Sequence, residues 1–145
     1  MSEADRVLTI LRREGRSLFQ YLREVPPWAN LREQHTVARL RELAAAELAV
    51  IESLSRWVQK QHEGTSHLGA FPDFTGLNDT ALHYLLPMVV REQTQHLLEL
   101  ERERPAVTDS AAGAFLDQLL ELKRRHGPEL DALSTPPHTF TTVNV

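Results

Sequence analysis

The sequence predicts an all-α protein with the architecture of an antiparallel four-helix bundle. Four long segments repeat apolar residues at alternating three- and four-residue steps, the spacing of a helix with one buried face. Glycine and proline separate these segments, and no segment alternates apolar and polar residues as a half-buried strand would. The chain of 145 residues is long enough for one domain with its own core. Four helices joined by short links favour antiparallel neighbours in an up-down-up-down order.

The first predicted helix covers residues 4–23 and ends before a pair of prolines. The second begins at Asn30, a favourable N-cap, and Glu33 completes a capping-box pattern three residues later. No glycine or proline interrupts this segment before Gly64, so we expect it to be the longest helix.

A connection rich in glycine and proline, residues 64–77, follows the second helix, and we expect its Leu68, Phe71 and Phe74 to cover one end of the core. The third helix is predicted from near Asn78 to Pro105. Pro87 lies inside it and should kink it, because proline removes a backbone donor and clashes with the preceding turn.

The fourth helix is predicted to start after Thr108 or Asp109 and to reach His126, where Gly127-Pro128 should interrupt it before a final turn to Leu133. Residues 1–134 would then form the bundle. Residues 135–145 have no helical period and are expected to be an extended C-terminal tail, either frayed or lying on this domain or on a partner.

Composition excludes several classes of protein. Acidic residues number 20 against 16 basic ones, with no long basic run, so nucleic acid is not an expected partner. Cysteine is absent, which excludes disulfides, thiolate catalysis and cysteine-ligated metals. No apolar run approaches the roughly 18 residues of a membrane span, and the N-terminus lacks a signal-peptide pattern, so we expect a soluble, cytoplasmic protein. No phosphate-binding loop or nucleophile elbow is present, and no enzymatic activity is expected.

Polar residues interrupt the apolar stripe of every predicted helix. Helices three and four share this pattern at an offset of 30 residues, with a polar residue and then a histidine three positions later. Burying such groups is costly unless they satisfy one another, so we expect them to meet at mid-height in a polar core network. The six residues are Glu14, Glu47, Gln93, His96, Lys123 and His126.

Lys123 is expected to form a buried or half-buried ion pair with Glu14 or Glu47. The alternative for either glutamate is a position at the edge of the stripe, with its carboxylate in water. A second apolar strip, formed by Leu43, Val50 and Trp57, predicts either core packing or a dimer contact.

This layout resembles the ferritin-like di-metal carboxylate bundles, in which two helices each supply one glutamate and two supply Glu-x-x-His. Glu14 and Glu47 match the single glutamates, whereas Gln93 to His96 and Lys123 to His126 stand where the two Glu-x-x-His motifs would be. Glutamine is a weak neutral ligand and lysine brings a positive charge, so the metal motifs are degenerate.

Two functions follow as expectations. The first is a non-catalytic helical-bundle interaction or assembly protein without a cofactor, which binds a protein partner or its own copies through the second strip, the 64–77 connection or the tail. The alternative, implied by the resemblance, is a ferritin-like metal-binding protein that holds Fe, Mn or Zn through His96, His126, Glu47 and Glu14.

Overall fold

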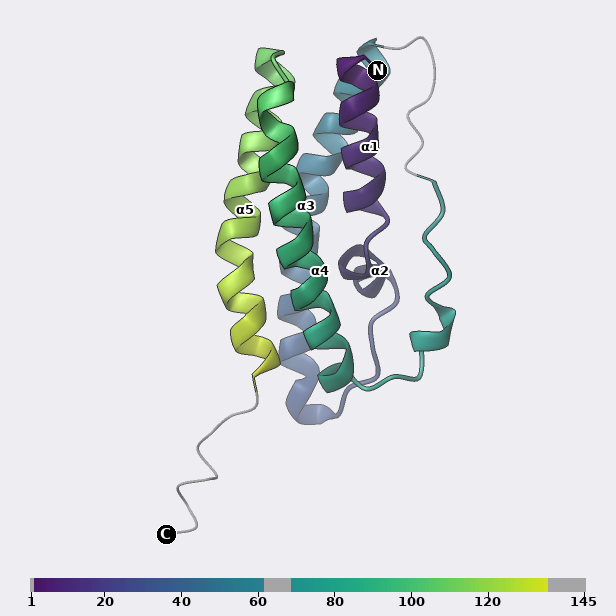
Figure 1. The fold of residues 1–145 in the computed structure, drawn as a ribbon. Coiled ribbons are helices and arrows are strands. Elements are labelled where there is room, and N and C mark those ends of the chain that lie inside the picture. The colour runs from purple at the N-terminus through teal and green to yellow at the C-terminus, as the bar shows by residue number, and fades with distance from the viewer. Residues whose placement is uncertain (1, 62–68, 136–145) are drawn as a thin grey trace.

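The computed structural model describes residues 2–61 and 69–135, and the regular elements among these residues are all helices, with no strand (Figure 1). The prediction of an all-α protein is therefore confirmed. The described residues contain five α-helices where the sequence predicts four. They are α1 (Glu3–Gly15), α2 (Leu18–Glu24), α3 (Gln34–Gln61), α4 (Leu82–Glu103) and α5 (Ser110–Ser134).

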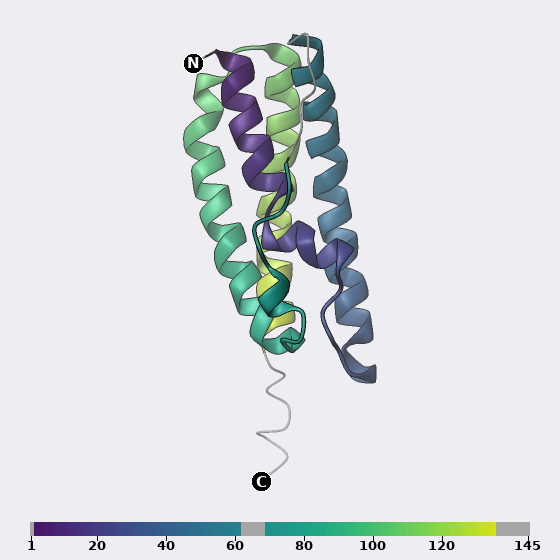
Figure 2. The same ribbon diagram turned by 90° about the vertical axis from the view of Figure 1, so that its right-hand side faces the viewer.

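Helices α1, α3, α4 and α5 lie side by side along one direction, whereas the short α2 runs across them (Figure 2). Helix α5 packs on both α3 and α4, and α1 packs on α3. Helices α1 and α5 run one way, and α3 and α4 run the other way (Figure 1). The expected up-down-up-down order is therefore wrong. Residues 69–81 run back along the outside of the helices, so α4 starts at the end where α3 starts.

The first predicted helix is divided into α1 and α2 at Arg16 and Ser17. Ser17 is the N-cap of α2, and its hydroxyl accepts a 3.1 Å hydrogen bond from the Gln20 backbone N–H. The first two N–H groups of α2, those of Leu18 and Phe19, have no acceptor within the helix. They donate hydrogen bonds of 2.9 and 3.2 Å to the Glu92 carboxylate of α4. A long-range carboxylate thus holds the start of the transverse helix.

Other helix ends differ from the prediction by small shifts. Asn30 and Glu33 form the predicted capping box, but it caps the 3-10 turn Leu31–Glu33, which leads into α3. Asp109, one of the two predicted starting points, caps α5, and α4 begins at Leu82, later than expected. The predicted interruption at Gly127-Pro128 is wrong, because α5 continues through it to Ser134.

The buried apolar side chains form two clusters, one above the other, joined by the long helices. The upper cluster contains Ala4, Val7, Ile10, Leu11, Val50, Ile51, Leu54, Trp57, Val58, Leu100, Val107, Ala112, Leu116, Leu119 and Leu120. The lower cluster contains Leu18, Phe19, Tyr21, Leu22, Val37, Leu40, Leu43, Ala44, Leu82, Leu85, Leu86, Val89 and Leu130.

The second apolar strip is part of this core. Leu43, Val50 and Trp57 are all buried within the single chain, so the strip is core packing and is not available as a dimer contact. Phe71 and Phe74 pack against the lower cluster and against the Tyr21 ring. Leu68 and residues 136–145, which carry the rest of the predicted tail, lie outside the described residues.

Candidate functional site: a buried ionic network

The ammonium group of Lys123 on α5 lies at the centre of a network of polar side chains. Its Nζ atom lies 2.6 Å from Glu14 Oε1 and 2.9 Å from Glu47 Oε1, and it donates a 2.8 Å hydrogen bond to Gln93 Oε1. The exposed fraction of the Lys123 side chain is 0%. The three hydrogens of the ammonium therefore meet three oxygen atoms, one each from α1, α3 and α4.

Glu47 joins Lys123 to a histidine. Its Oε1 atom accepts from Lys123, and its Oε2 atom lies 2.6 Å from His126 Nδ1. An ionised carboxylate only accepts hydrogen bonds, so the shared hydrogen is carried by Nδ1 of the imidazole. Both oxygens of this buried carboxylate are thereby satisfied.

Glu14, the last residue but one of α1, connects the network to the surface. Its Oε2 atom accepts a 3.0 Å hydrogen bond from Arg13 Nε, and Arg13 Nη1 bonds Glu103 at 2.7 and 2.8 Å and pairs with Glu99 at 3.2 Å. The sequence did not single out Arg13, because it lies at the edge of the apolar stripe. Its position next to Glu14 is the only signal that the sequence offers.

His96 is less closely involved than predicted. Its side chain is only partly buried, and its Nδ1 atom lies 3.6 Å from Glu14 Oε1, beyond hydrogen-bond distance. The structure thus connects Glu14, Glu47, Gln93, Lys123 and His126 directly and leaves His96 at the rim.

Glu14 and Lys123 stay ionised because the opposite charges beside them outweigh their burial. Burial alone raises the pKa of Glu14, but the Lys123 ammonium and the His96 ring beside it hold that pKa well below the usual 4.5. Burial also lowers the pKa of Lys123, yet the two carboxylates raise it above the usual 10.5. At neutral pH, Lys123 and Glu14 therefore form an ion pair in the interior.

The network occupies the level between the two apolar clusters. On α3, Glu47 separates Ala44 of the lower cluster from Val50 of the upper one. On α5, Lys123 and His126 separate Leu120 from Leu130 in the same way. All the long helices are polar at one height, so the core is apolar above and below an ionic layer.

The network differs from a metal centre in its donor set. Among residues 2–61 and 69–135, no group of three or more histidine, aspartate or glutamate side chains is placed to hold a metal ion. The Lys123 ammonium lies within contact distance of both glutamates, where a metal bridging them would lie. A metal cation there would be repelled by the ammonium and would compete with it for the same oxygens.

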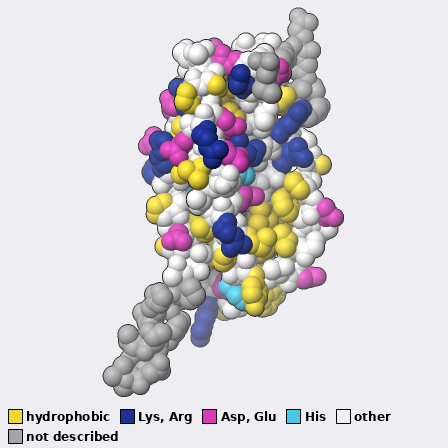
Figure 3. Space-filling view, in the orientation of Figure 1, with side chains coloured by type: hydrophobic (Ala, Val, Ile, Leu, Met, Phe, Trp, Pro, Cys, Tyr) yellow, Lys and Arg dark blue, Asp and Glu magenta, His cyan; other side chains and the backbone are white. Residues whose placement is uncertain are grey.

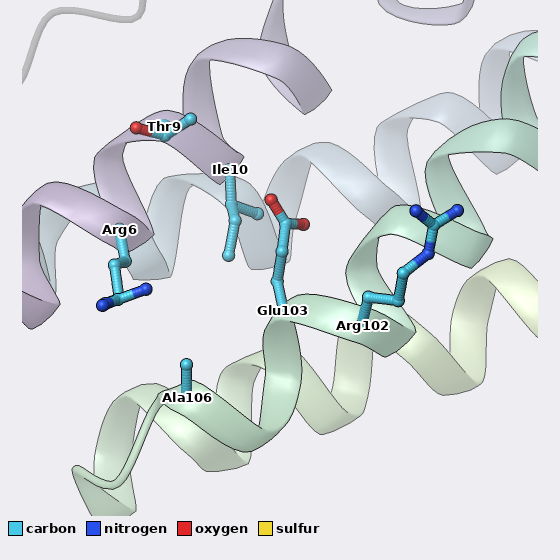
Figure 4. A pocket seen from close by; sticks show the side chains of 6 residues that line it. All are labelled: Arg6, Thr9, Ile10, Arg102, Glu103 and Ala106. Carbon is cyan, nitrogen blue, oxygen red and sulfur yellow. The ribbon is translucent and has the colours of Figure 1, made fainter.

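The largest openings lie on the surface, away from Lys123. A smaller opening, between α1 and the end of α4, has a volume of about 250 Å³ and is lined by Arg6, Ile10 and Glu103 among others (Figure 4). In this view Arg102 is turned away from Arg6, so the two guanidinium groups do not face a common ligand.

No protein-family model matches this chain, and neither the curated proteins nor the solved structures contain a match. No helix in the described part of the chain is both long and apolar enough to span a membrane. Function must therefore be argued from the network and from the surface.

Proposed function

We propose that this chain is a non-catalytic interaction or assembly protein, built on a four-helix bundle of ferritin-like layout. One observation carries the proposal: the Lys123 ammonium lies 2.6–2.9 Å from oxygens of Glu14, Glu47 and Gln93, and its side chain is 0% exposed. An internal cation replaces the metal ion that bundles of this layout hold between their glutamates. No substrate reaches an ammonium enclosed in this way.

The connectivity supports the ferritin-like layout. Ferritin-like folds join their helices with one long crossover connection, and this chain has one between α3 and α4. Glutamates of α1 and α3 face α4 and α5, as the single glutamates of that class face its Glu-x-x-His helices. Gln93 and Lys123 stand in place of the two acidic residues of those motifs.

Metal analysis tests the proposal against the metal-binding alternative. Protein purified without a histidine tag should contain no stoichiometric Fe, Mn or Zn, because Lys123 neutralises the glutamates. Near-stoichiometric metal that disappears in the His96→Ala/His126→Ala variant would overturn the proposal. Exposed surface histidines, such as His35, give a matched control, since His35→Ala should not change the metal content in either case.

Three large apolar side chains of the described residues form a candidate surface for a protein partner or a second copy. Its members are Trp28, Leu31 and Tyr84, exposed by 65%, 90% and 66%. A backbone bridge joins Trp28 to Ala81, one turn before Tyr84, so the three side chains belong to the end where α3 and α4 start. We call them the end patch. Large exposed side chains grouped in this way mark interaction surfaces. Figure 3 shows apolar side chains gathered on the lower half of the face seen in Figure 1.

Sedimentation over a range of concentrations tests the end patch. The wild-type chain should associate, and Trp28→Ser/Leu31→Ser/Tyr84→Ser should shift the distribution towards the monomer. Leu98→Ser removes an exposed leucine from the C-terminal part of α4, at the other end of that helix from Tyr84, and should leave association unchanged. Identical distributions for all three proteins would exclude the end patch as the assembly surface.

A further inference from the structure

Three buried side-chain nitrogen atoms have no hydrogen-bond partner within the described parts of the chain, and all three belong to residues that line one cavity. The atoms are Arg13 Nη2, Arg16 Nε and His96 Nδ1. The cavity has a volume of about 310 Å³, and Arg12 and Pro72 complete its lining. We call it the arginine cavity.

A buried donor without an acceptor is destabilising, because it loses its hydrogen bonds to water without replacing them. Chance would scatter such atoms over the protein, whereas here they belong to side chains that line a single cavity. Guanidinium groups only donate hydrogen bonds, so whatever satisfies them must present acceptors. Three arginines around one opening favour an acceptor that also carries negative charge.

The protein's own carboxylates do not fill this role. Arg13 Nε donates to Glu14, and Arg13 Nη1 pairs with Glu99 and Glu103. Only Nη2 of this guanidinium group has no acceptor among the described residues. His96 Nδ1 is 3.6 Å from Glu14, which is too far for a hydrogen bond. The described residues thus place no carboxylate oxygen on any of the three nitrogen atoms.

The cavity is also held in shape by its surroundings. Arg16 lies in the break between α1 and α2, which is held by Ser17 and by Glu92 of α4. The connection passes close to the Arg16 side chain at Gly69, where the backbone adopts a φ of +86° that favours glycine. The backbone at Arg16 is therefore held in place by contacts with α4 and with the connection.

We infer that the arginine cavity is a binding site for a small oxyanion, either phosphate or a carboxylate of similar size. Arg13, Arg16 and His96 would donate to the anion, and Arg12 would add positive charge at the opening. Guanidinium groups bind both kinds of oxyanion through paired N–H donors. The site goes beyond the proposed function, since it does not depend on self-association or on the end patch.

The neighbouring cavity of Figure 4 shows what the arginine cavity has in addition. It too is bordered by arginines, Arg6 and Arg102, but none of its side chains carries a buried nitrogen or oxygen without a partner. Arg6→Gln, in the helix that ends next to Arg16 and with the same loss of charge, is therefore a matched control for Arg16→Gln.

Calorimetric titration and thermal unfolding with inorganic phosphate test the inference, with succinate as the carboxylate probe and sodium chloride at equal ionic strength as the blank. At ten times its Kd, the bound anion should raise the Tm by about 3–6 °C. Arg16→Gln should weaken binding at least tenfold, and Arg6→Gln should leave it within a factor of two. Phosphate should also shift the NMR signals of the His96 ring.

Binding of phosphate but not succinate would assign the site to phosphate, and the reverse result would assign it to carboxylates; either one supports the inference. Two results would overturn it. One is the absence of binding by both probes, which would mean that only water fills the cavity. The other is an equal loss of affinity in Arg6→Gln and Arg16→Gln, which would mean that the anion responds only to the overall charge of the protein. Arg16 forms no ion pair in the described structure, so Arg16→Gln should remain folded.

Discussion

Replacing Lys123 with methionine should destabilise the protein strongly, because it removes the cation that holds two buried carboxylates. Methionine keeps an unbranched apolar chain only one heavy atom shorter than lysine, so the change acts mainly on the charge. Glu14 and Glu47 would then face each other without the ammonium that separates them, and Gln93 Oε1 would lose its donor. Breaking a buried ion pair by removing one partner costs about 3–5 kcal/mol.

The geometry places the expected loss near the lower limit of that range. Glu14 retains Arg13 at 3.0 Å, and Glu47 retains His126 at 2.6 Å, so neither carboxylate is left without a donor. A loss of about 3 kcal/mol is still a large part of the stability of a domain, which is typically about 5–15 kcal/mol. Lys123→Met/Glu14→Leu/Glu47→Leu replaces the charges with apolar groups and should recover most of this loss.

Urea unfolding followed by far-UV circular dichroism measures these free energies. Arg39→Met is the matched control, because Arg39 also contacts two glutamates, Glu42 and Glu129, but on the surface. Exposed ion pairs contribute little, so this control should scarcely change the unfolding curve. The reasoning would be refuted if Lys123→Met cost no more than Arg39→Met, or if the triple variant were as unstable as the single one.

Three further predictions concern single side chains. The folded-state pKa of Glu14 lies below its usual 4.5, so the ionised Glu14 stabilises the protein fully above pH 4.5 and loses this effect as the pH falls below that value. The difference in unfolding free energy between wild type and Glu14→Gln should therefore shrink below pH 4.5, and a constant difference would contradict this prediction. Pro128 lies inside α5 with its side chain exposed, so Pro128→Ala restores a helical hydrogen bond and should raise the free energy of unfolding in urea by about 1–3 kcal/mol. An unchanged or lower free energy of unfolding would contradict this prediction. Glu92→Ala removes the acceptor for two N–H groups of α2 and should lower the free energy of unfolding by about 1–2 kcal/mol. Glu92→Gln keeps an oxygen acceptor and should lower it by less. Equal losses for the two variants would mean that only the charge of Glu92 matters.

The apolar spacing predicted the helices well, because each long helix buries one stripe against the others. The same spacing picked out the residues of the network, since a polar residue on a buried stripe needs a partner. Spacing along one helix says nothing about depth, however. His96 follows Gln93 by three residues on the same stripe, yet it lies at the rim, because α1 and α4 are joined there mainly by the charged side chains of Arg13 and its glutamates.

The break between α1 and α2 had local signals, Gly15 followed by Ser17-x-x-Gln20, but they are weaker than the apolar repeat that runs across them. The break is stabilised by Glu92, a residue far away in the sequence whose carboxylate accepts a hydrogen bond from the first N–H of α2. At Gly127-Pro128 the opposite happens, since local breakers are overridden. Gly127 has no Cβ to clash with the proline ring, and continuing the helix buries Leu130 in the lower cluster.

The connection before α4 is long enough to let α4 run in the same direction as α3. Helix α3 has 28 residues and is about 42 Å long at 1.5 Å per residue. Residues 62–81, when extended at about 3.3 Å each, span about 65 Å, enough to return along the whole helix. A connection of this length permits α3 and α4 to be parallel, whereas the short links assumed from the sequence do not.

The ionic layer also explains why the long helices keep their relative heights. If α5 slid by one turn, about 5.4 Å, the Lys123 ammonium would enter one of the two leucine-rich clusters without an acceptor. The penalty would include the desolvation of the lysine and the loss of charge compensation for Glu14 and Glu47, whereas a slide between purely apolar layers would exchange one leucine contact for another. The cation therefore selects one register among several that apolar packing alone would allow. A metal ion bound between glutamates fixes the relative heights of helices in the same way. Here the cation is the side chain of Lys123, a residue of α5, so the register does not depend on a bound metal ion.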